Sequence, residues 1–338
     1  MKRKLHAFNT GEDGRDNEET GELRSEILST IKTNNTVTMA AVCGMNDVKK
    51  ALLDAIVLPK TFAQRPGLAL LYGPPGTGKT HIIRAVAHVS KCTLFVVKAS
   101  DIGSKYHGQS EKKIRLLFEE AQKQHYSIIF IDDLDCIFLN RDNGSNEDED
   151  DRKILASFLT EINRIGDDIH NVAVLAATNR PWTLDLAVQD RFDTKIYAPL
   201  PGLETRKSIL KLQMKGHEND LDDDNFQHLA QALQGATVRE VGSLAKMACL
   251  ESMKGDNTYA EANGKYRPTL RCNRCPQYQE DSKVKCDRCG AIHISPYDVP
   301  DGSLECRSVK MDDFVKNLKP NYCSVTDEMR QQYEGWNK

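Results

Sequence analysis

The stretch that decides the fold is Gly73-Pro74-Pro75-Gly76-Thr77-Gly78-Lys79-Thr80, which fills the G-x-x-x-x-G-K-[ST] pattern of a phosphate-binding P-loop (Walker A). The apolar run 68–72 before it predicts a buried parallel strand, and 81–89 after it has helical apolar spacing. Strand, turn and helix N-terminus together favour anions, because unpaired backbone N–H groups point at the phosphates. We therefore expect all the residues of the stretch to contact a nucleotide, with Lys79 at its β- and γ-phosphates and the Thr80 hydroxyl on Mg²⁺.

Two further apolar strands end in polar residues. The strand expected at 127–131 runs into Asp132 and Asp133, a Walker B arrangement, and the strand expected at 172–176 is followed by Asn179. Ligands of open α/β sheets lie at the carboxyl ends of the strands, so these side chains should meet the nucleotide. We expect Asp132 to hold Mg²⁺, Asp133 to orient and deprotonate the attacking water, and Asn179 to lie near the γ-phosphate.

The composition limits the function classes. A chain of 338 residues can form two domains, and its formal net charge of −3 gives no basic footprint, so nucleic acid is not the expected partner. The chain begins with basic residues but lacks the apolar segment of a signal peptide, and no stretch approaches the length of a membrane span. We expect a reducing, cytoplasmic setting, with recruitment to membranes or cytoskeleton through a partner.

The fold class expected from these patterns is α/β: a P-loop large domain with a parallel sheet covered by helices on both faces, plus a small helical lid. Residues 1–36 form a polar segment, disordered to about residue 20, with a short linker helix around Leu23–Ile31. The large domain covers 37–200, and Pro199-Leu200-Pro201-Gly202 marks the boundary. The lid covers 201–338, interrupted by an insertion at 268–296.

The insertion carries a strong metal signal. It has the pattern Cys-x₂-Cys, ten intervening residues, Cys-x₂-Cys, formed by Cys272, Cys275, Cys286 and Cys289. Four thiolates at this spacing suit a closed, structural zinc ribbon, and an iron–sulfur site is the less common alternative. The segment has few large apolar residues, so zinc would supply its folding energy, roughly 10–16 kcal/mol. His293 and Cys306 are spare ligands, and nearby basic residues raise a nucleic-acid role as a further alternative.

Taken together, the motifs resemble the AAA ATPases of the meiotic clade, which contains katanin, spastin, fidgetin and the vacuolar-protein-sorting ATPase that disassembles ESCRT filaments. The stretches that carry the resemblance are Gly73–Thr80, Asp132–Asp135, Ala177–Trp182, Ile196–Pro201 and Met311–Phe314. The resemblance implies a ring hexamer that hydrolyses ATP at its subunit interfaces and pulls a polypeptide through a central pore. It also places the insertion where one relative docks a protein cofactor.

The resemblance assigns further roles by position. Asn179 matches the sensor asparagine, and Arg191 matches the arginine finger that a neighbouring subunit inserts toward the γ-phosphate. Such a finger contributes roughly 10³–10⁵ in rate to related phosphoryl transfers. The pore loop is matched by Lys105-Tyr106-His107-Gly108, and Gly44 is a further candidate nucleotide contact.

Three departures bear on the mechanism. Asp133 replaces the usual glutamate, which withdraws the carboxylate by about 1.5 Å, and a misplacement of about 1 Å can cost on the order of 100-fold in rate. Thr194 and Lys195 stand where the family often has another arginine, and Arg239 opens a lid helix where it could act as a second sensor. The alternative function is therefore a degenerate AAA protein that binds ATP as a scaffold. A nucleic-acid ATPase is a third hypothesis, against which the aromatic pore loop argues.

Overall fold

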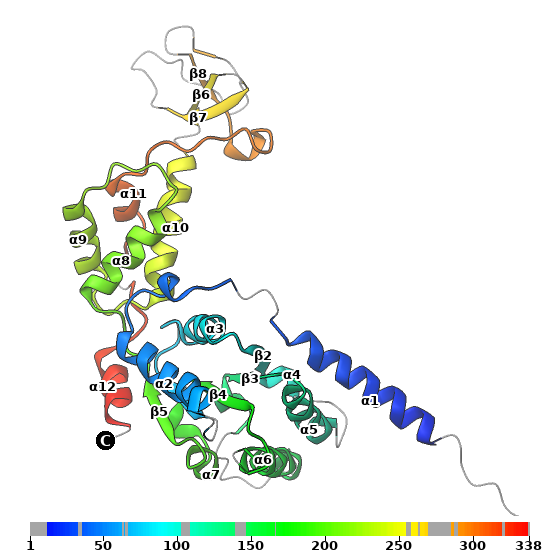
Figure 1. Cartoon of the computed structure of the whole chain (residues 1–338). Helices are drawn as coiled ribbons and strands as arrows, with labels where there is room; N and C mark the ends of the chain where they lie inside the picture. Colours follow the sequence, from blue (N-terminus) through cyan, green and yellow to red (C-terminus); the bar gives the residue numbers. More distant parts are fainter. Residues whose placement is uncertain are drawn as a thin grey trace, which may run out of the picture. The chain divides into compact units, whose positions relative to one another are not determined.

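The computed structural model describes residues 12–32, 36–62, 64, 67–102, 109–138, 147–165, 167–254, 258–262, 264–269, 285–286, 290–319 and 322–336. The chain divides into two compact units (Figure 1). The first contains Met1–Pro199 and Glu328–Lys338, and the second contains Leu200–Asp327.

A five-stranded parallel sheet forms the centre of the first unit. Its strands are β1 (Leu68–Tyr72), β2 (Thr93–Lys98), β3 (Ser127–Asp132), β4 (Val172–Thr178) and β5 (Thr194–Tyr197), in the order β2-β3-β4-β1-β5. Every residue of β1 and β4 is buried, as their continuous apolar sequences predict. Because Tyr72 pairs with Thr178, both strands end at the same level. The P-loop and Asn179 therefore leave the sheet side by side, and the predicted parallel sheet is confirmed.

Helices cover both faces of this sheet (Figure 1). On one face, α2 (Asn46–Phe62) and α3 (Lys79–Ser90) pack on the sheet through a cluster that includes Leu52, Ile82 and Leu71. On the other face lie α5 (Gln109–Gln122) and α6 (Glu147–Asn163), whose Phe118 and Phe158 pack on the opposite side chains of the same strands. The short helices are α4 (Ala99–Ile102), α7 (Leu186–Gln189) and the 3₁₀ turns Met39–Ala41, Leu134–Cys136 and Pro181–Thr183.

The N-terminal helix is longer than predicted. Helix α1 spans Glu12–Ser29, although we expected residues before about 20 to be disordered. Leu23 and Ile27 are buried against the first unit, and Ile31 forms an antiparallel bridge with Phe95 at the β2 edge. Once this anchored turn exists, extending the helix through residues that include good helix formers such as glutamate costs little.

The second unit is built from helices α8 (Leu203–Met214), α9 (Asp223–Ala232), α10 (Val238–Lys254) and α11 (Met311–Val315), as the lid prediction requires. Between α10 and α11 lies a small antiparallel sheet, in the order β7-β6-β8. Its strands are β6 (Thr258–Ala262), β7 (Lys265–Pro268) and β8 (Ala291–His293), followed by the 3₁₀ turn Pro296–Asp298. The inserted structure therefore begins before residue 268.

The last helix, α12 (Asp327–Gly335), differs in placement from the predicted lid range of 201–338. Its residues from Glu328 onward group with the first unit. The physical reason is aromatic packing: Tyr333 is buried, and the Trp336 ring lies 4.7 Å from the Tyr72 ring between centroids.

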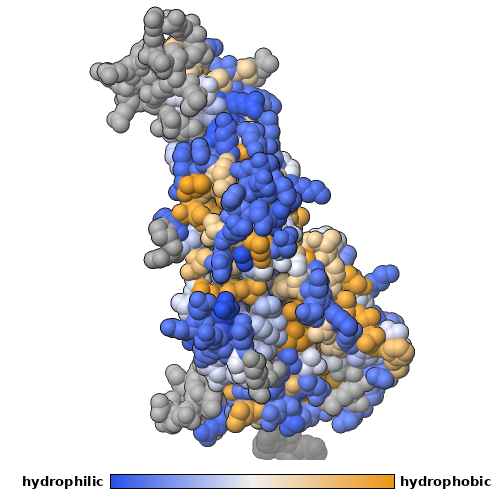
Figure 2. Space-filling model, turned by 90° about the vertical axis from the view of Figure 1, so that its left-hand side faces the viewer, coloured by the Kyte–Doolittle hydropathy of each residue, from blue (hydrophilic) through white to orange (hydrophobic). Residues whose placement is uncertain are grey.

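Hydrophilic residues cover most of the face drawn in Figure 2, and the hydrophobic residues on it form separate patches. In the part of the chain that the structure describes, no helix combines the length and apolar character needed to cross a bilayer.

Candidate nucleotide site

The P-loop backbone takes conformations that glycine alone adopts easily. Gly73 has φ +149°, and a Cβ added there would lie 2.4 Å from the carbonyl oxygen of Ala198. Gly78 is the residue before α3 and has φ +98°, in the left-handed region. The loop thus passes tightly from β1 into a 12-residue helix whose first N–H groups lack helical partners. This arrangement is a site for an anion, and phosphate is the anion that the motif predicts.

Lys79 is held inside this loop. Its side chain is buried, and Nζ donates hydrogen bonds to the carbonyl oxygens of Gly73 (2.8 Å) and Pro74 (3.0 Å). A third bond joins Nζ to Oδ1 of Asn179 at 2.7 Å. The hydroxyl of Thr77, which is fully buried, closes the loop by donating to Pro74 O at 3.0 Å. The ammonium is therefore fixed where a polyphosphate on the loop would meet it.

Hard oxygen donors converge beside Lys79. The Thr80 hydroxyl donates to Oδ2 of Asp132 at 2.7 Å, which links the first turn of α3 to the last residue of β3. A hydroxyl and a carboxylate are the donor types that Mg²⁺ takes alongside phosphate oxygens. The residues present fit a magnesium ion, as the sequence predicts.

Asp133 points at Asn179. Its backbone is left-handed (φ 53°, ψ 52°), and its Oδ1 accepts a hydrogen bond from Nδ2 of Asn179 at 2.9 Å. Burial, followed by the charges of Asp132 and Asp135, raises the pKa of Asp133, while Lys79 and Lys98 oppose this shift. Aspartate tolerates the left-handed region better than most residues. The unusual backbone therefore aims the shorter carboxylate into the site.

Asp135 organises the end of β4, a role that the sequence analysis missed. Its Oδ1 accepts from the Thr178 hydroxyl at 2.7 Å and from the backbone N–H of Asn179 at 3.3 Å. Its side chain is nearly buried. The signal was present in the acidic run 132–135, but nothing in the run shows which carboxylate faces the neighbouring strand.

Gly44 lies in a segment that reaches the P-loop. Gly44 and Met45 both have positive φ values, +65° and +52°. A Cβ on Gly78 would lie 3.6 Å from Cε of Met45, so this segment borders the helix end that would face phosphate. The Gly44 assignment stays a prediction with this support.

Arg191 is not part of the hydrogen-bonded cluster. It follows α7, its side chain is exposed, and within the described residues that side chain has no partner. Its neighbour Phe192 is buried and fixes the backbone there. Lys195, by contrast, lies over the Trp336 ring at 5.4 Å from Nζ to the ring centroid. Arg239 is exposed on α10 in the second unit.

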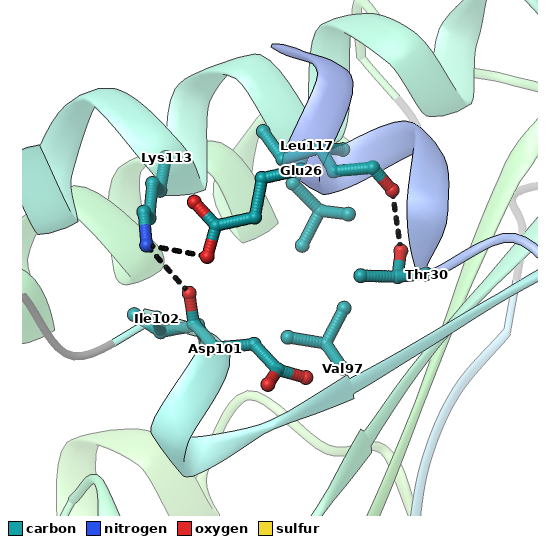
Figure 3. Close-up of a pocket in the computed structure, with 8 residues that line it drawn as sticks. Glu26, Thr30, Val97, Asp101, Ile102, Lys113 and Leu117 are labelled. Atoms are coloured by element: carbon teal, nitrogen blue, oxygen red, sulfur yellow. Dashed lines mark hydrogen bonds and ion pairs between the residues drawn. The ribbon is translucent and has the colours of Figure 1, made fainter. Parts of the chain in front are cut away.

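The predicted pore-loop residues Lys105, Tyr106 and His107 lie outside the described residues, but both flanks of the loop are described. Nζ of Lys113 on α5 pairs with the Glu26 carboxylate of α1 at 3.0 Å and donates to Asp101 O of α4 at 3.1 Å (Figure 3). Helix α1 is thus tied to the elements on either side of 103–108.

Of the four cysteines in the predicted zinc module, Cys272, Cys275 and Cys289 lie outside the described residues. Cys286 is described and is 4% exposed. Its N–H donates to Ala291 O, and Gly290 N–H donates back to Cys286 O, both at 2.8 Å. Among the described residues no group of three potential metal ligands occurs.

Comparisons with known proteins agree with this geometry. Residues 69–200 match the model of the ATPase family associated with various cellular activities (AAA). Protein SUPPRESSOR OF K(+) TRANSPORT GROWTH DEFECT 1 of Arabidopsis thaliana is 37% identical over 252 residues, which are 72% of this chain and 58% of that protein. Vacuolar protein sorting-associated protein 4B of Mus musculus is 31% identical over 332 residues, which are 94% of this chain and 73% of that protein.

A solved structure of the FIGL-1 AAA domain in complex with ADP superposes with a TM-score of 0.70 at 27% identity, covering 99% of this chain and 98% of that one. The chain spans only 56–61% of the length of the first three curated relatives it matches. The family match over the P-loop sheet and the similarity to a relative along nearly the whole chain show that this protein belongs to the AAA ATPase family.

Proposed function

We propose that this protein hydrolyses ATP as a member of a ring, a hexamer in the simplest case, and uses the energy to pull a polypeptide through a central pore. Remodelling of this kind includes ESCRT-filament disassembly and microtubule severing. One observation carries the proposal: direct hydrogen bonds connect Lys79 to Asn179 and Asn179 to Asp133, next to the Thr80–Asp132 bond. The groups needed for phosphate binding, metal binding and water activation therefore meet at one sheet edge.

The roles of these groups follow from their chemistry. The backbone of 73–80 and Lys79 bind and orient the triphosphate, while Thr80 and Asp132 hold Mg²⁺, which neutralises charge on the phosphates when bound. Asp133 is the base that accepts a proton from the attacking water. The hydrogen bond from Nδ2 of Asn179 holds its carboxylate in the site for this task. Asn179 orients the groups around the γ-phosphate.

The ring part of the proposal rests on Arg191. Its exposed side chain has no partner in the described part of its own chain, so it is available to a neighbouring subunit's nucleotide. Contacts that run head to tail around a ring let each subunit complete the next subunit's site. Tyr106 would then grip an extended peptide by apolar contact that does not depend on its sequence.

Steady-state ATP turnover per subunit, measured against protein concentration, tests this function. We expect turnover to rise with concentration as rings form, and to fall by about 10³-fold or more in Arg191→Ala. Arg152→Ala is the control, because Arg152 is exposed too. ATP binding without turnover at any concentration would instead indicate a scaffold.

We also propose that Cys272, Cys275, Cys286 and Cys289 hold a structural zinc ion, and that the insertion they stabilise docks a protein cofactor. The spacing of the cysteines supports the metal, and so does the burial of Cys286, whose backbone bonds Gly290 and Ala291. The docking role rests on the resemblance alone, which places the insertion where a relative docks a protein cofactor.

Metal content of the purified protein tests the zinc proposal. We expect about one zinc per chain in the wild type and little in Cys286→Ser. Cys323→Ser is the matched control in the same unit, because among the described residues Sγ of Cys323 bonds only the carbonyl oxygen of Gln234. Equal metal content in all three proteins would reject Cys286 as a ligand.

A further inference from the structure

The last helix reaches into the nucleotide site through one hydroxyl. Tyr333 lies on α12, 154 residues after Asn179, and its OH donates to the backbone carbonyl oxygen of Asn179 at 2.5 Å. Tyr333 is only 2% exposed, so water does not compete freely for this bond. Asn179 comes directly after the last residue of β4, where the strand ladder has ended. The hydroxyl therefore fixes a peptide group that the sheet no longer holds.

Aromatic rings hold Tyr333 in place. The ring of Trp182 lies 5.1 Å from the Tyr333 ring, and Tyr197 stacks on it at 6.4 Å with 19° between the planes. Three residues further along, Trp336 packs edge-on against Tyr72, the last residue of β1 before the P-loop. The end of the chain is thus anchored at the ends of β1 and β4, two of the three strands whose ends form the site.

The Asn179 side chain is the part of the site that most needs a fixed backbone. Its amide has two bonds of opposite kind: Oδ1 accepts from Lys79, and Nδ2 donates to Asp133. A small rotation of the Asn179 peptide would break one bond or both. Loss of either bond would leave the lysine or the carboxylate less well aimed, and a misplacement of about 1 Å can cost on the order of 100-fold in rate.

We infer that Tyr333 is a positioning residue for ATP hydrolysis: its hydroxyl holds the Asn179 peptide so that the amide bridges Lys79 and Asp133. This inference rests on the proposed function of that site. It adds a group from the end of the chain to a site otherwise built from residues 73–179.

The test is Tyr333→Phe, which removes the hydroxyl and keeps the ring. We expect the kcat for ATP to fall about tenfold, with nucleotide affinity and KM within about twofold of wild type. Tyr197→Phe is the matched control: within the described residues its hydroxyl has no hydrogen-bond partner, so its kcat should not change. Sedimentation of each variant at the assay concentration shows that ring formation is the same.

A double-mutant cycle with Asn179→Ala separates positioning from general stability. If Tyr333 acts through the Asn179 side chain, Tyr333→Phe changes kcat little once that side chain is gone. An equal loss in both backgrounds, or a kcat for Tyr333→Phe matching that of wild type, would overturn the inference.

Hydrogen exchange at the amides of Asn179 and Arg180 provides a readout independent of turnover. These amides bond Asp135 and Thr178 and should exchange faster in Tyr333→Phe than in wild type or Tyr197→Phe. An inactive wild type would count against the proposed function alone, and unchanged exchange would count against the inference.

Discussion

The nucleotide edge of the first unit and the inserted sheet of the second are held together in different ways. At the nucleotide edge, every residue of β1 and β4 is buried, and the residues after them are joined by side-chain hydrogen bonds. The inserted sheet has a small buried cluster of Tyr259, Ile292, Ile294 and Val299. A large core can fix a site by packing, whereas a small sheet depends on single links.

One such link is present in the described part of the insertion, and the proposed metal would add a second. Tyr259 is fully buried, and its hydroxyl lies within hydrogen-bond distance of the carbonyl oxygens of Met253 and Lys254 at the end of α10. Cys286 is the second, as one proposed metal ligand. A small cluster needs such support because little apolar surface is removed from water. The contrast predicts that the insertion can unfold while the nucleotide site stays intact.

The largest expected effect is the loss of the proposed metal. In Cys286→Ser, or after chelation, we expect the amides of β6 and β8 to lose exchange protection, because such sites contribute roughly 10–16 kcal/mol to folding. Protection of β1 and β4 should stay unchanged. If the inserted sheet and the strands β1 and β4 lost exchange protection together, the two regions would not differ in the way proposed.

The next effect concerns the nucleotide edge. Lys79→Ala removes the ammonium from the P-loop, and we expect ATP turnover to fall by about 10³-fold or more. The protein should stay folded because the sheet core is untouched, with a modest fall in unfolding temperature from the oxygen atoms that lose Lys79 as donor. Lys50→Ala, an exposed lysine on α2, should keep full turnover. If Lys79→Ala kept its ATP turnover, the hydrolysis site could not be the P-loop.

The helical part of the second unit contains a partly buried ion pair. Arg307 donates two hydrogen bonds to the Asp313 carboxylate, at 2.8 and 2.5 Å, and the Asp313 side chain is 1% exposed. Replacing Arg307 with Met removes the ion-pair partner of that carboxylate and should destabilise α11 by about 3 kcal/mol. Arg267→Met breaks an exposed pair with Glu218 and should cost less than about 1 kcal/mol. Chemical denaturation of the two variants, with hydrogen exchange at the amides of α10 and α11 as the readout, compares their losses of stability.

The same pair makes stability depend on pH. Burial opposes ionisation of Asp313, but hydrogen bonds from Arg307 and the Lys310 N–H outweigh it, so its pKa is lowered in the folded protein. The stabilisation is therefore complete above the unfolded pKa of about 3.9 and is lost as pH falls through the lower folded value. Wild type and Arg307→Met should converge at low pH. A difference in the free energy of unfolding between the two proteins that stays constant with pH would exclude this pH dependence.

The smallest effect is expected at Asp133. Its left-handed backbone already places the carboxylate on Asn179, so Asp133→Glu would push the carboxylate past that partner by about 1.5 Å. We expect turnover to fall about tenfold, although glutamate is the family's usual residue. A rise in turnover would show that the aspartate is a handicap, as the sequence alone suggested.

The sequence predicted the regions where one local pattern determines the structure. Apolar runs that end in a P-loop, in Asp132 or just before Asn179 identify strands and place their ends together, because parallel strands share an edge. The inserted strands were missed because Thr258–Ala262 and Lys265–Pro268 lie in a polar segment that contains glycine. Their pairing depends on a cluster completed by Ile292 and Val299, far along the chain.

Other features of the site depend on three-dimensional packing that no motif encodes. The bond from Tyr333 to Asn179 joins residues 154 positions apart. The left-handed turn at Asp133 follows from the tertiary setting of an ordinary acidic run. Both features orient a side chain that the motif already predicts to be present. A motif therefore identifies which groups form a site, but not how they are oriented.

The most direct test of the account mixes two inactive variants. The Arg191→Ala variant has an intact P-loop but cannot supply Arg191 to a neighbouring subunit. The Lys79→Ala variant can supply Arg191 but lacks a working P-loop. We predict that an equal mixture recovers about a quarter of wild-type turnover, because half the subunits have a P-loop and half their neighbours have the arginine. A mixture no more active than either variant alone would contradict a site shared between subunits.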